Sequence, residues 1–185
     1  MNELLHFLNS RNSAPKLTEP GPTPEQLEEI ISAGLRAPDH ARLRPWRFLS
    51  VSGERRRDLG QLFRQALVER NPDADEAARA KAENAPLRAP LVLVVVCRLS
   101  EHPKVPHVEQ RLSAGCAAHG ILLAAEALGY AGIWRTGDVS FDRAFMNALG
   151  LDSNEEISGF LYLGTRDGVP KPLPSLQAAD YCRSW

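Results

Sequence analysis

The chain has 185 residues, of which 43% are hydrophobic and 24% are charged, and this is the composition of a globular protein rather than a disordered one. Its formal net charge of -1 provides no general attraction to nucleic acid or to anionic membrane surfaces. The longest strongly apolar run, residues 91–97, is far shorter than the roughly 20 residues that a membrane-spanning helix needs. We therefore expect neither a nucleic-acid-binding protein nor a membrane protein.

The three cysteines, Cys97, Cys116 and Cys182, are widely spaced and match neither a redox pair nor a metal-binding motif. The N-terminal residues lack the basic region and the small-residue cleavage site of a signal peptide. We therefore expect reduced thiols in a cytoplasmic protein without a metal site, with Cys97 and Cys116 buried as small hydrophobic side chains.

The first half of the chain is predicted to be mainly helical. Its hydrophobic patterns predict helices at 2–10, 24–35, 55–70 and 73–84, and a short strand at 48–51. Thr23 followed by Pro24 and Glu25 is typical of a helix start, because the threonine can cap the helix and proline is tolerated in its first turn.

The second half carries the strongest strand and the longest helix. Residues 89–97 do not alternate between apolar and polar, which indicates a strand covered on both faces. Residues 106–129 form a helical pattern whose small and apolar side chains lie all round, which predicts a buried helix with His119 in the core or at an interface. The remaining patterns predict strands at 131–134 and 157–163, a helix at 141–149, and a tail from residue 165 that wraps over a surface.

These elements predict a single α+β domain spanning residues 1–185, in which helices cover a sheet of about four or five strands. The sequence holds no Gly-x-Gly-x-x-Gly motif, no P-loop, no His-Glu-x-x-His and no Gly-x-Ser-x-Gly. Instead, four segments place arginine with polar residues at the ends of elements: 11–13, 36–44, 132–137 and 164–166. Each alone is compatible with an ordinary surface turn, but together they suit a phosphorylated cofactor with polar edges.

The ordered set of motifs resembles the nitroreductase family of FMN-dependent oxidoreductases, and in particular its small, compact bacterial branch of NAD(P)H nitroreductases. The resemblance covers nearly the whole chain, and its motifs are 11–13, 36–40 with 45–46, 104–106 with 109–110, 113–116, 132–137 and 159–165.

The resemblance implies a nitroreductase-like fold, with a central, mixed but mainly antiparallel sheet, and a homodimer that binds FMN in clefts at its interface. The residues that would bind the cofactor within one subunit are Arg11, Asn12, Ser13, Trp134, Arg135 and Thr136. Arg36 and His40 would reach the FMN of the other subunit. The segment that would contact NAD(P)H is Ala124, Ala125, Glu126, Ala127, Leu128 and Gly129.

The implied activity is electron transfer from NAD(P)H through FMN to a small organic acceptor, either nitroaromatic or quinone-like, by a ping-pong mechanism. The flavin carries the chemistry, so no catalytic side chain is expected. Lys16, Arg36 and Arg135 are the candidates for a positive charge beside the flavin N1/C2 oxygen edge. Two alternatives remain open: a flavin-binding or flavin-handling dimer with little NAD(P)H turnover, and a flavin-free dimer that uses only the fold.

Overall fold

The computed structural model describes residues 2–185; the expected domain of residues 1–185 also includes Met1, which lies outside the described part. Its strands are β1 (Leu17–Thr18), β2 (Trp46–Ser52), β3 (Leu91–Arg98), β4 (Ala131–Arg135) and β5 (Glu155–Arg166). The central strand β5 pairs with β3, β4 and β1, and β2 pairs with β3 on its other side. All of these described pairings are antiparallel.

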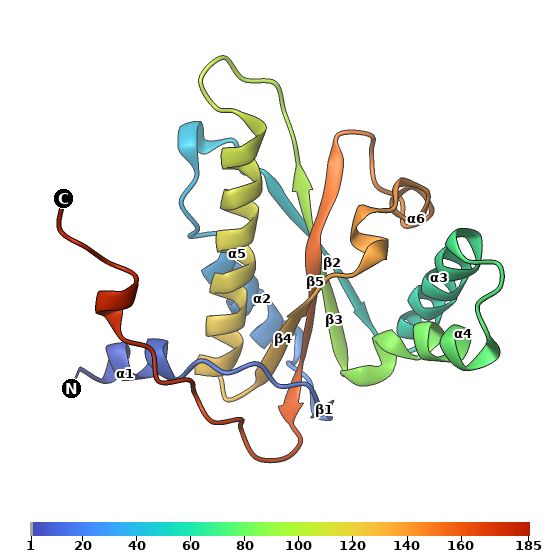
Figure 1. Cartoon of the computed structure of the whole chain (residues 1–185), viewed down its shortest axis with the longest axis horizontal. Helices are drawn as coiled ribbons and strands as arrows, with labels where there is room; N and C mark the ends of the chain where they lie inside the picture. The colour runs from blue at the N-terminus through green and yellow to red at the C-terminus, as the bar shows by residue number, and fades with distance from the viewer. Residues whose placement is uncertain (1) are drawn as a thin grey trace.

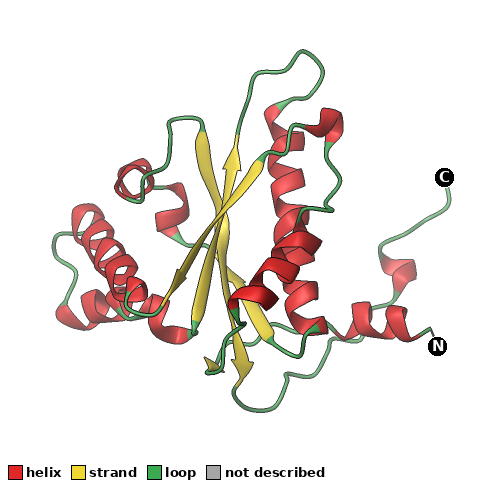
Figure 2. Cartoon of the chain, turned by 180° about the vertical axis from the view of Figure 1, so that it is seen from behind, coloured by secondary structure: helices red, strands yellow, loops and turns green. Residues whose placement is uncertain are grey.

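Helices cover both faces of the sheet, as the non-alternating sequence of β3 predicts. The helices α2 (Pro24–Gly34) and α5 (His107–Ala127) pack on one face, and α3 (Arg55–Arg70), α4 (Glu76–Glu83) and α6 (Arg143–Ala148) lie on the other side (Figures 1 and 2). Leu93 packs in the cluster on the α5 side and Val94 in the cluster on the α3 side, and both are fully buried. In the described part of the chain, no helix is long and apolar enough to cross a membrane.

The predicted start of α2 is confirmed. The Thr23 hydroxyl accepts a hydrogen bond from the backbone N–H of Gln26 at 3.3 Å, and the Gln26 side chain accepts one from the backbone N–H of Thr23 at 3.0 Å. This reciprocal capping box satisfies two donors that would otherwise be unpaired, and Pro24 takes a position where no N–H is needed. The end of α2 leads into the charged loop at residues 36–44.

The prediction that Cys116 is buried is wrong for the chain by itself, and His119 lies outside this chain's core, so its place at an interface stays a prediction. The helix is buried on the side facing the sheet, but Cys116 and His119 are exposed. Small side chains allow any neighbouring backbone to pack closely against a helix. The sequence pattern therefore does not show whether a given side of α5 packs against the sheet of the same chain or faces away from it. Cys97, in contrast, is buried as predicted, and its pKa is raised to about 11 chiefly by removal from water.

The two ends of the chain lie together, away from the sheet (Figure 1). The short helix α1 (Glu3–Ser10) has no buried residue, and residues 167–185 are all exposed. The Asn12 side chain donates a hydrogen bond to the Lys171 carbonyl at 2.5 Å, which joins the two segments. The prediction that the tail wraps over a surface is therefore wrong within this chain, because its apolar residues find no surface of the same chain to cover.

The remaining differences concern short elements. The predicted helix 141–149 is a 3₁₀ turn at Asp138–Phe141 followed by α6, because the Asp142 side chain accepts hydrogen bonds from two backbone N–H groups and starts a new helix there. The strand β1 was not predicted, since two residues carry no readable alternation.

A buried carboxylate joins β2, β3 and β5 at one end of the sheet. Glu155 is fully buried, and its oxygens accept hydrogen bonds from Arg47 at 2.6 and 2.5 Å, from Arg98 at 3.0 Å and from the Asp152 backbone N–H at 3.1 Å. The Arg47 guanidinium is the main reason that the pKa of Glu155 is lowered to about 2, against the opposing effect of burial. The carboxylate is therefore charged at neutral pH, with its charge matched by two arginines.

We expect Glu155→Ala to lower the free energy of unfolding by about 3 kcal/mol, because Arg47 and Arg98 lose their buried partner. Because the folded pKa lies below the ordinary value of 4.5, the stabilisation is present above pH 4.5 and is lost as the pH falls towards 2. Urea unfolding at several pH values measures both effects. The exposed pair between Arg55 and Asp58 provides the control, since Asp58→Ala should cost less than about 1 kcal/mol. Equal losses for the two variants would contradict the special role of Glu155.

Candidate functional site

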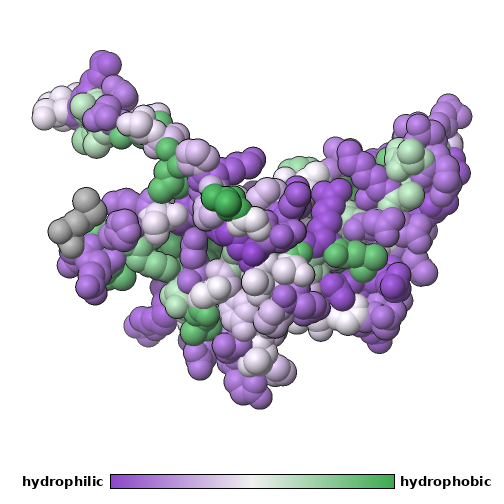
Figure 3. All heavy atoms as spheres, turned by 90° about the horizontal axis from the view of Figure 1, so that it is seen from below, coloured by the Kyte–Doolittle hydropathy of each residue, from purple (hydrophilic) through white to green (hydrophobic). Residues whose placement is uncertain are grey.

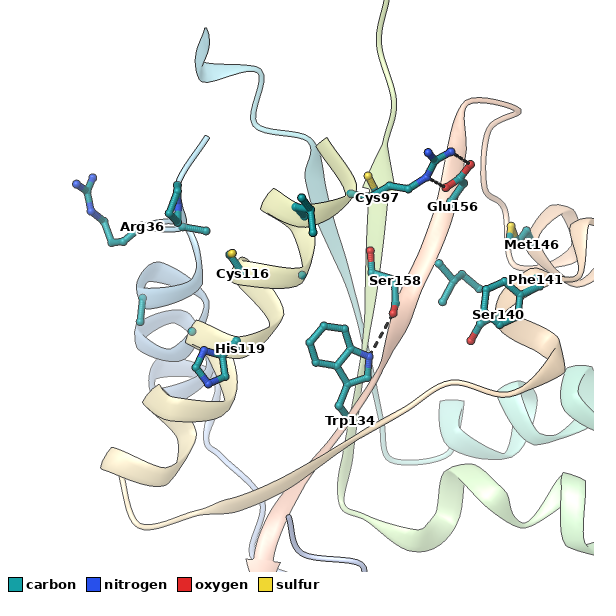
Figure 4. A pocket seen from close by; sticks show the side chains of 18 of the residues that line it. Arg36, Cys97, Cys116, His119, Trp134, Ser140, Phe141, Met146, Glu156 and Ser158 are labelled. Atoms are coloured by element: carbon teal, nitrogen blue, oxygen red, sulfur yellow. Dashed lines mark hydrogen bonds and ion pairs between the residues drawn. The ribbon is translucent and has the colours of Figure 1, made fainter. Parts of the chain in front are cut away.

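A cavity of about 1100 Å³ lies between α5, the end of α2, β5 and residues 138–146. Arg36, Cys116 and His119 lie on its α2 and α5 side, and Ser140 and Phe141 lie on the opposite side (Figure 4). The surface of the cavity is mostly apolar, with a few polar groups. Cavities of this size and character are typical of sites for small molecules and cofactors.

A β-bulge in β5 positions the indole of Trp134 in this cavity. Val95 of β3 pairs with Gly159 while Val96 pairs with Ile157, so Ser158 is an extra residue of β5 at this point. Its free carbonyl accepts a hydrogen bond from Trp134 Nε1 at 3.2 Å (Figure 4). Any Cβ at Gly159 would overlap this indole, which explains why glycine fits there.

Ser140 supplies an unused hydroxyl in the cavity wall. The residue is 1% exposed, and its Oγ has no hydrogen-bond partner in the described part of the chain. A buried hydroxyl without a partner is costly, and a ligand oxygen or nitrogen would satisfy it. The neighbouring Phe141 is 80% exposed, so this side of the cavity also presents an apolar ring to the outside.

A second cleft, of about 440 Å³, lies on the other face of β4 and is cationic. Arg135 places its guanidinium carbon 5.7 Å from the centroid of the Tyr162 ring, and its buried Nε has no partner among the described residues. Arg88 lines the same cleft and also a neighbouring one with Lys16. Burial raises the pKa of Tyr162, so its ring carries no charge that would oppose a bound anion at neutral pH.

Two hydrogen bonds join the N-terminal segment 11–13 and the adjacent Ala14 to the sheet, one from a backbone N–H and one from a side chain. The Ala14 N–H donates to the Gly132 carbonyl at 3.0 Å, and the Arg166 side chain donates to the Asn12 carbonyl at 3.0 Å. Residues 132 and 135 are about 10 Å apart along an extended strand. Of the predicted cofactor residues, Trp134 and Arg135 lie on β4 and Thr136 directly follows it. Arg11, Asn12 and Ser13 line neither of the two cavities described above.

The other two predicted cofactor residues lie elsewhere. Arg36 is exposed at the end of α2, where it lines the large cavity. His40 is exposed, and its Nδ1 lies 2.7 Å from Glu109 Oε2. His40 lines neither of the two cavities described above.

The segment predicted to contact NAD(P)H, residues 124–129, forms the end of α5 and the turn after it. Ala125 is fully buried against the sheet, whereas Ala127, Leu128 and Gly129 are exposed. None of the described cavities includes a residue of this segment.

Sequence reasoning missed Arg88 and Ser140, and it included Glu109 in a motif of the resemblance without giving it a role. Arg88 directly precedes the buried strand β3, so the search for arginines at element ends could have found it. Ser140 gives no such signal, because its importance comes from having no partner in the folded chain. Glu109 becomes significant only through its contact with His40, which is 69 residues away in sequence.

We expect Gly159→Ala to displace the Trp134 indole and break its hydrogen bond to Ser158, since the added Cβ has no room. The free energy of unfolding should fall by about 1–3 kcal/mol, and the near-ultraviolet circular dichroism should change. Gly115→Ala is the matched control, because its Cβ would lie 3.7 Å from the same indole, at ordinary contact distance. A wild-type spectrum for Gly159→Ala would show that the indole does not depend on this glycine.

Comparison with known proteins adds independent findings. The model of the family described as "Nitroreductase family" matches residues 8–165. A protein of Escherichia coli strain K12, YdjA, whose name marks it as a proposed NAD(P)H nitroreductase, is 42% identical over 179 residues, which cover 93% of this chain and 97% of that protein. The crystal structure of a nitroreductase-like family protein from Bacillus cereus superposes with a TM-score of 0.84 at 20% identity, covering 100% of this chain and 97% of the other. A Bacteroides fragilis nitroreductase with bound FMN gives a TM-score of 0.75 at 22% identity, with 100% of both chains covered.

Proposed function

The chain belongs to the nitroreductase family, and on this basis we propose that it is an FMN-dependent oxidoreductase that takes electrons from NAD(P)H and passes them to a small organic acceptor. The solved relative from Bacteroides fragilis binds FMN, and the relative from Escherichia coli carries NAD(P)H in its name. The observation that best supports the proposal in this chain is the cationic cleft beside β4, which is lined by Arg88 and by Arg135 with its unpartnered Nε.

FMN has a phosphate, a hydroxylated ribityl chain and a flat ring with polar edges, and the predicted cofactor residues offer hydrogen-bond donors for these parts. We assign Arg11, Asn12 and Ser13 to the phosphate and the ribityl chain, because a guanidinium and a hydroxyl are suitable donors for both. We assign Trp134, Arg135 and Thr136 to the same cofactor. Arg135 lies in the cationic cleft, where its buried Nε would gain a partner if an anionic part of the cofactor binds there.

We further propose that the protein is a homodimer with FMN at its interface. Val108, Leu112, Cys116 and His119 are exposed and follow a helical spacing, so they form one stripe along α5. Two copies of such a stripe can pack against each other about a two-fold axis. In this arrangement Arg36 and His40 would reach the FMN of the other subunit.

The two chain ends support the same assembly. Leu4 and Leu5 of α1 are 66% and 55% exposed, and Leu176 and Tyr181 of the tail are 65% and 75% exposed. Seen from below, the tail stands clear of the body and carries hydrophobic residues among hydrophilic ones (Figure 3). Exposed apolar side chains on α1 and on the C-terminal tail favour contact with a second copy of the chain.

When bound, FMN would supply the hydride and electron transfer between NAD(P)H and the acceptor. The chain would bind the cofactor through the β4 residues and keep the flavin in a mostly apolar cavity. The donor would contact residues 124–129 through the exposed end of α5 and leave before a nitroaromatic or quinone-like acceptor enters, which gives ping-pong kinetics. Ser140 is placed to donate a hydrogen bond to an oxygen of a ligand in the large cavity.

We expect the purified protein, supplied with FMN, to show flavin absorbance that bleaches when NADH or NADPH is added without oxygen. The faster of the two reductants identifies the preferred donor. Bound flavin that does not bleach at a useful rate would instead favour a flavin-handling dimer. Protein that takes up no FMN would contradict the proposal and leave only a shared fold.

We expect Arg11→Ala to weaken FMN binding by about 1.5–3 kcal/mol through loss of a charge-assisted contact, measured by quenching of flavin fluorescence. Arg55→Ala, which changes an exposed arginine on α3, is the control and should bind FMN normally.

Mixing Arg11→Ala subunits with His40→Ala subunits tests the cross-subunit arrangement. Each site would use Arg11 of one subunit and His40 of the other, so one of the two sites in a mixed dimer should have both residues intact and should bind FMN normally. Absence of any recovery would exclude the cross-subunit arrangement.

A further inference from the structure

A hydrogen bond between His40 and Glu109 connects the charged loop after α2 to the first turn of α5. The two atoms, Nδ1 of His40 and Oε2 of Glu109, are 2.7 Å apart. A carboxylate only accepts hydrogen bonds, so Nδ1 of the imidazole carries the proton in this contact. The other ring nitrogen, Nε2, makes no hydrogen bond to any residue within 2–185 and remains available.

The loop that carries His40 is held in an unusual shape. Ala41, Arg42 and Arg44 have φ values of 62°, 55° and 49°, which is the left-handed region that residues with a side chain seldom occupy. Asp39 supports this shape, because its carboxylate accepts hydrogen bonds from the backbone N–H groups of Leu43 at 3.1 Å and Arg44 at 2.7 Å. Strained backbone that is fixed in this way is typical of functional sites.

The start of α5, which carries Glu109, is also held in place by hydrogen bonds. Gln110 is 1% exposed, and its side chain accepts a hydrogen bond from the Ser100 N–H at 2.9 Å and donates to the Ser100 and Val105 carbonyls at 2.8 and 3.3 Å. These bonds anchor the start of α5 to the preceding loop. Glu109 therefore starts from a rigid backbone in the first turn of α5.

We propose that Glu109 is a positioning residue for the cofactor site: it fixes the orientation and the tautomer of His40, so that Nε2 faces the FMN of the other subunit. This inference rests on the proposed function, because His40 acts on a cofactor only in the dimer. Glu109 itself does not touch the cofactor. An imidazole in a solvent-exposed loop would otherwise rotate and exchange its proton between the two nitrogens.

The first test needs no cofactor. In ¹H–¹⁵N spectra of the full chain in alkaline buffer, we expect His40 to carry its proton on Nδ1. Glu109→Gln should keep this tautomer, because the amide oxygen can still accept the hydrogen bond, whereas Glu109→Ala should lose it. Retention of the Nδ1 proton in Glu109→Ala would overturn the inference.

The second test measures FMN affinity in the dimer. His40→Ala and Glu109→Ala should each weaken binding by about tenfold, and the double variant should also be weakened by about tenfold rather than a hundredfold. Glu101→Ala is the matched control, because Glu101 forms a comparable contact with His107 at 3.2 Å near the same end of α5. This variant should bind FMN as the wild type does.

The outcomes separate this inference from the proposed function. Wild-type affinity in Glu109→Ala beside weakened binding in His40→Ala would overturn only the positioning role. Wild-type affinity in His40→Ala would overturn the cross-subunit cofactor site and the positioning role together. Multiplicative losses in the double variant would show that the two residues act independently, which also overturns the inference.

Discussion

The pairing of β5 with its neighbours is the constraint on which the rest of the structure depends. This 12-residue strand is the partner of β3, β4 and β1, and most of its side chains are buried. Its register with β4 places Trp134 opposite Leu161 and Arg135 opposite Phe160. Because successive side chains of a strand point to opposite faces, Trp134 enters the large cavity and Arg135 enters the cationic cleft.

Much of the framework could be predicted from local sequence. The start of α2 follows from Thr23 and Pro24, and the coverage of β3 on both faces follows from its unbroken apolar run. These two framework predictions succeeded because capping and apolar periodicity act over a few residues, so one sequence is enough to recognise them. For the candidate site, the arginines at the ends of elements single out segments 11–13 and 132–137, whose cofactor roles stay predictions.

The features that could not be predicted depend on contacts between distant segments or with another molecule. The exposure of Cys116 depends on which side of α5 the sheet occupies, and its small side chain suits either side. The bulge at Ser158 results from a shift in the pairing register of β3 and β5, and no single residue in the sequence predicts such a shift. The left-handed backbone at Ala41 and Arg42 contradicts the preference of both residues and needs support from the Asp39 carboxylate and the rest of the loop.

The order of strands along the chain has a consequence for biosynthesis. The central strand β5 follows all the other strands in sequence, so β3 and β4 have no central partner until residue 166 has left the ribosome. The seven consecutive buried residues 91–97 of β3 must meanwhile be kept from pairing with other chains. A nascent chain that stalls before β5 thus presents an aggregation-prone edge, which makes translation through this strand the step at which folding competes with aggregation.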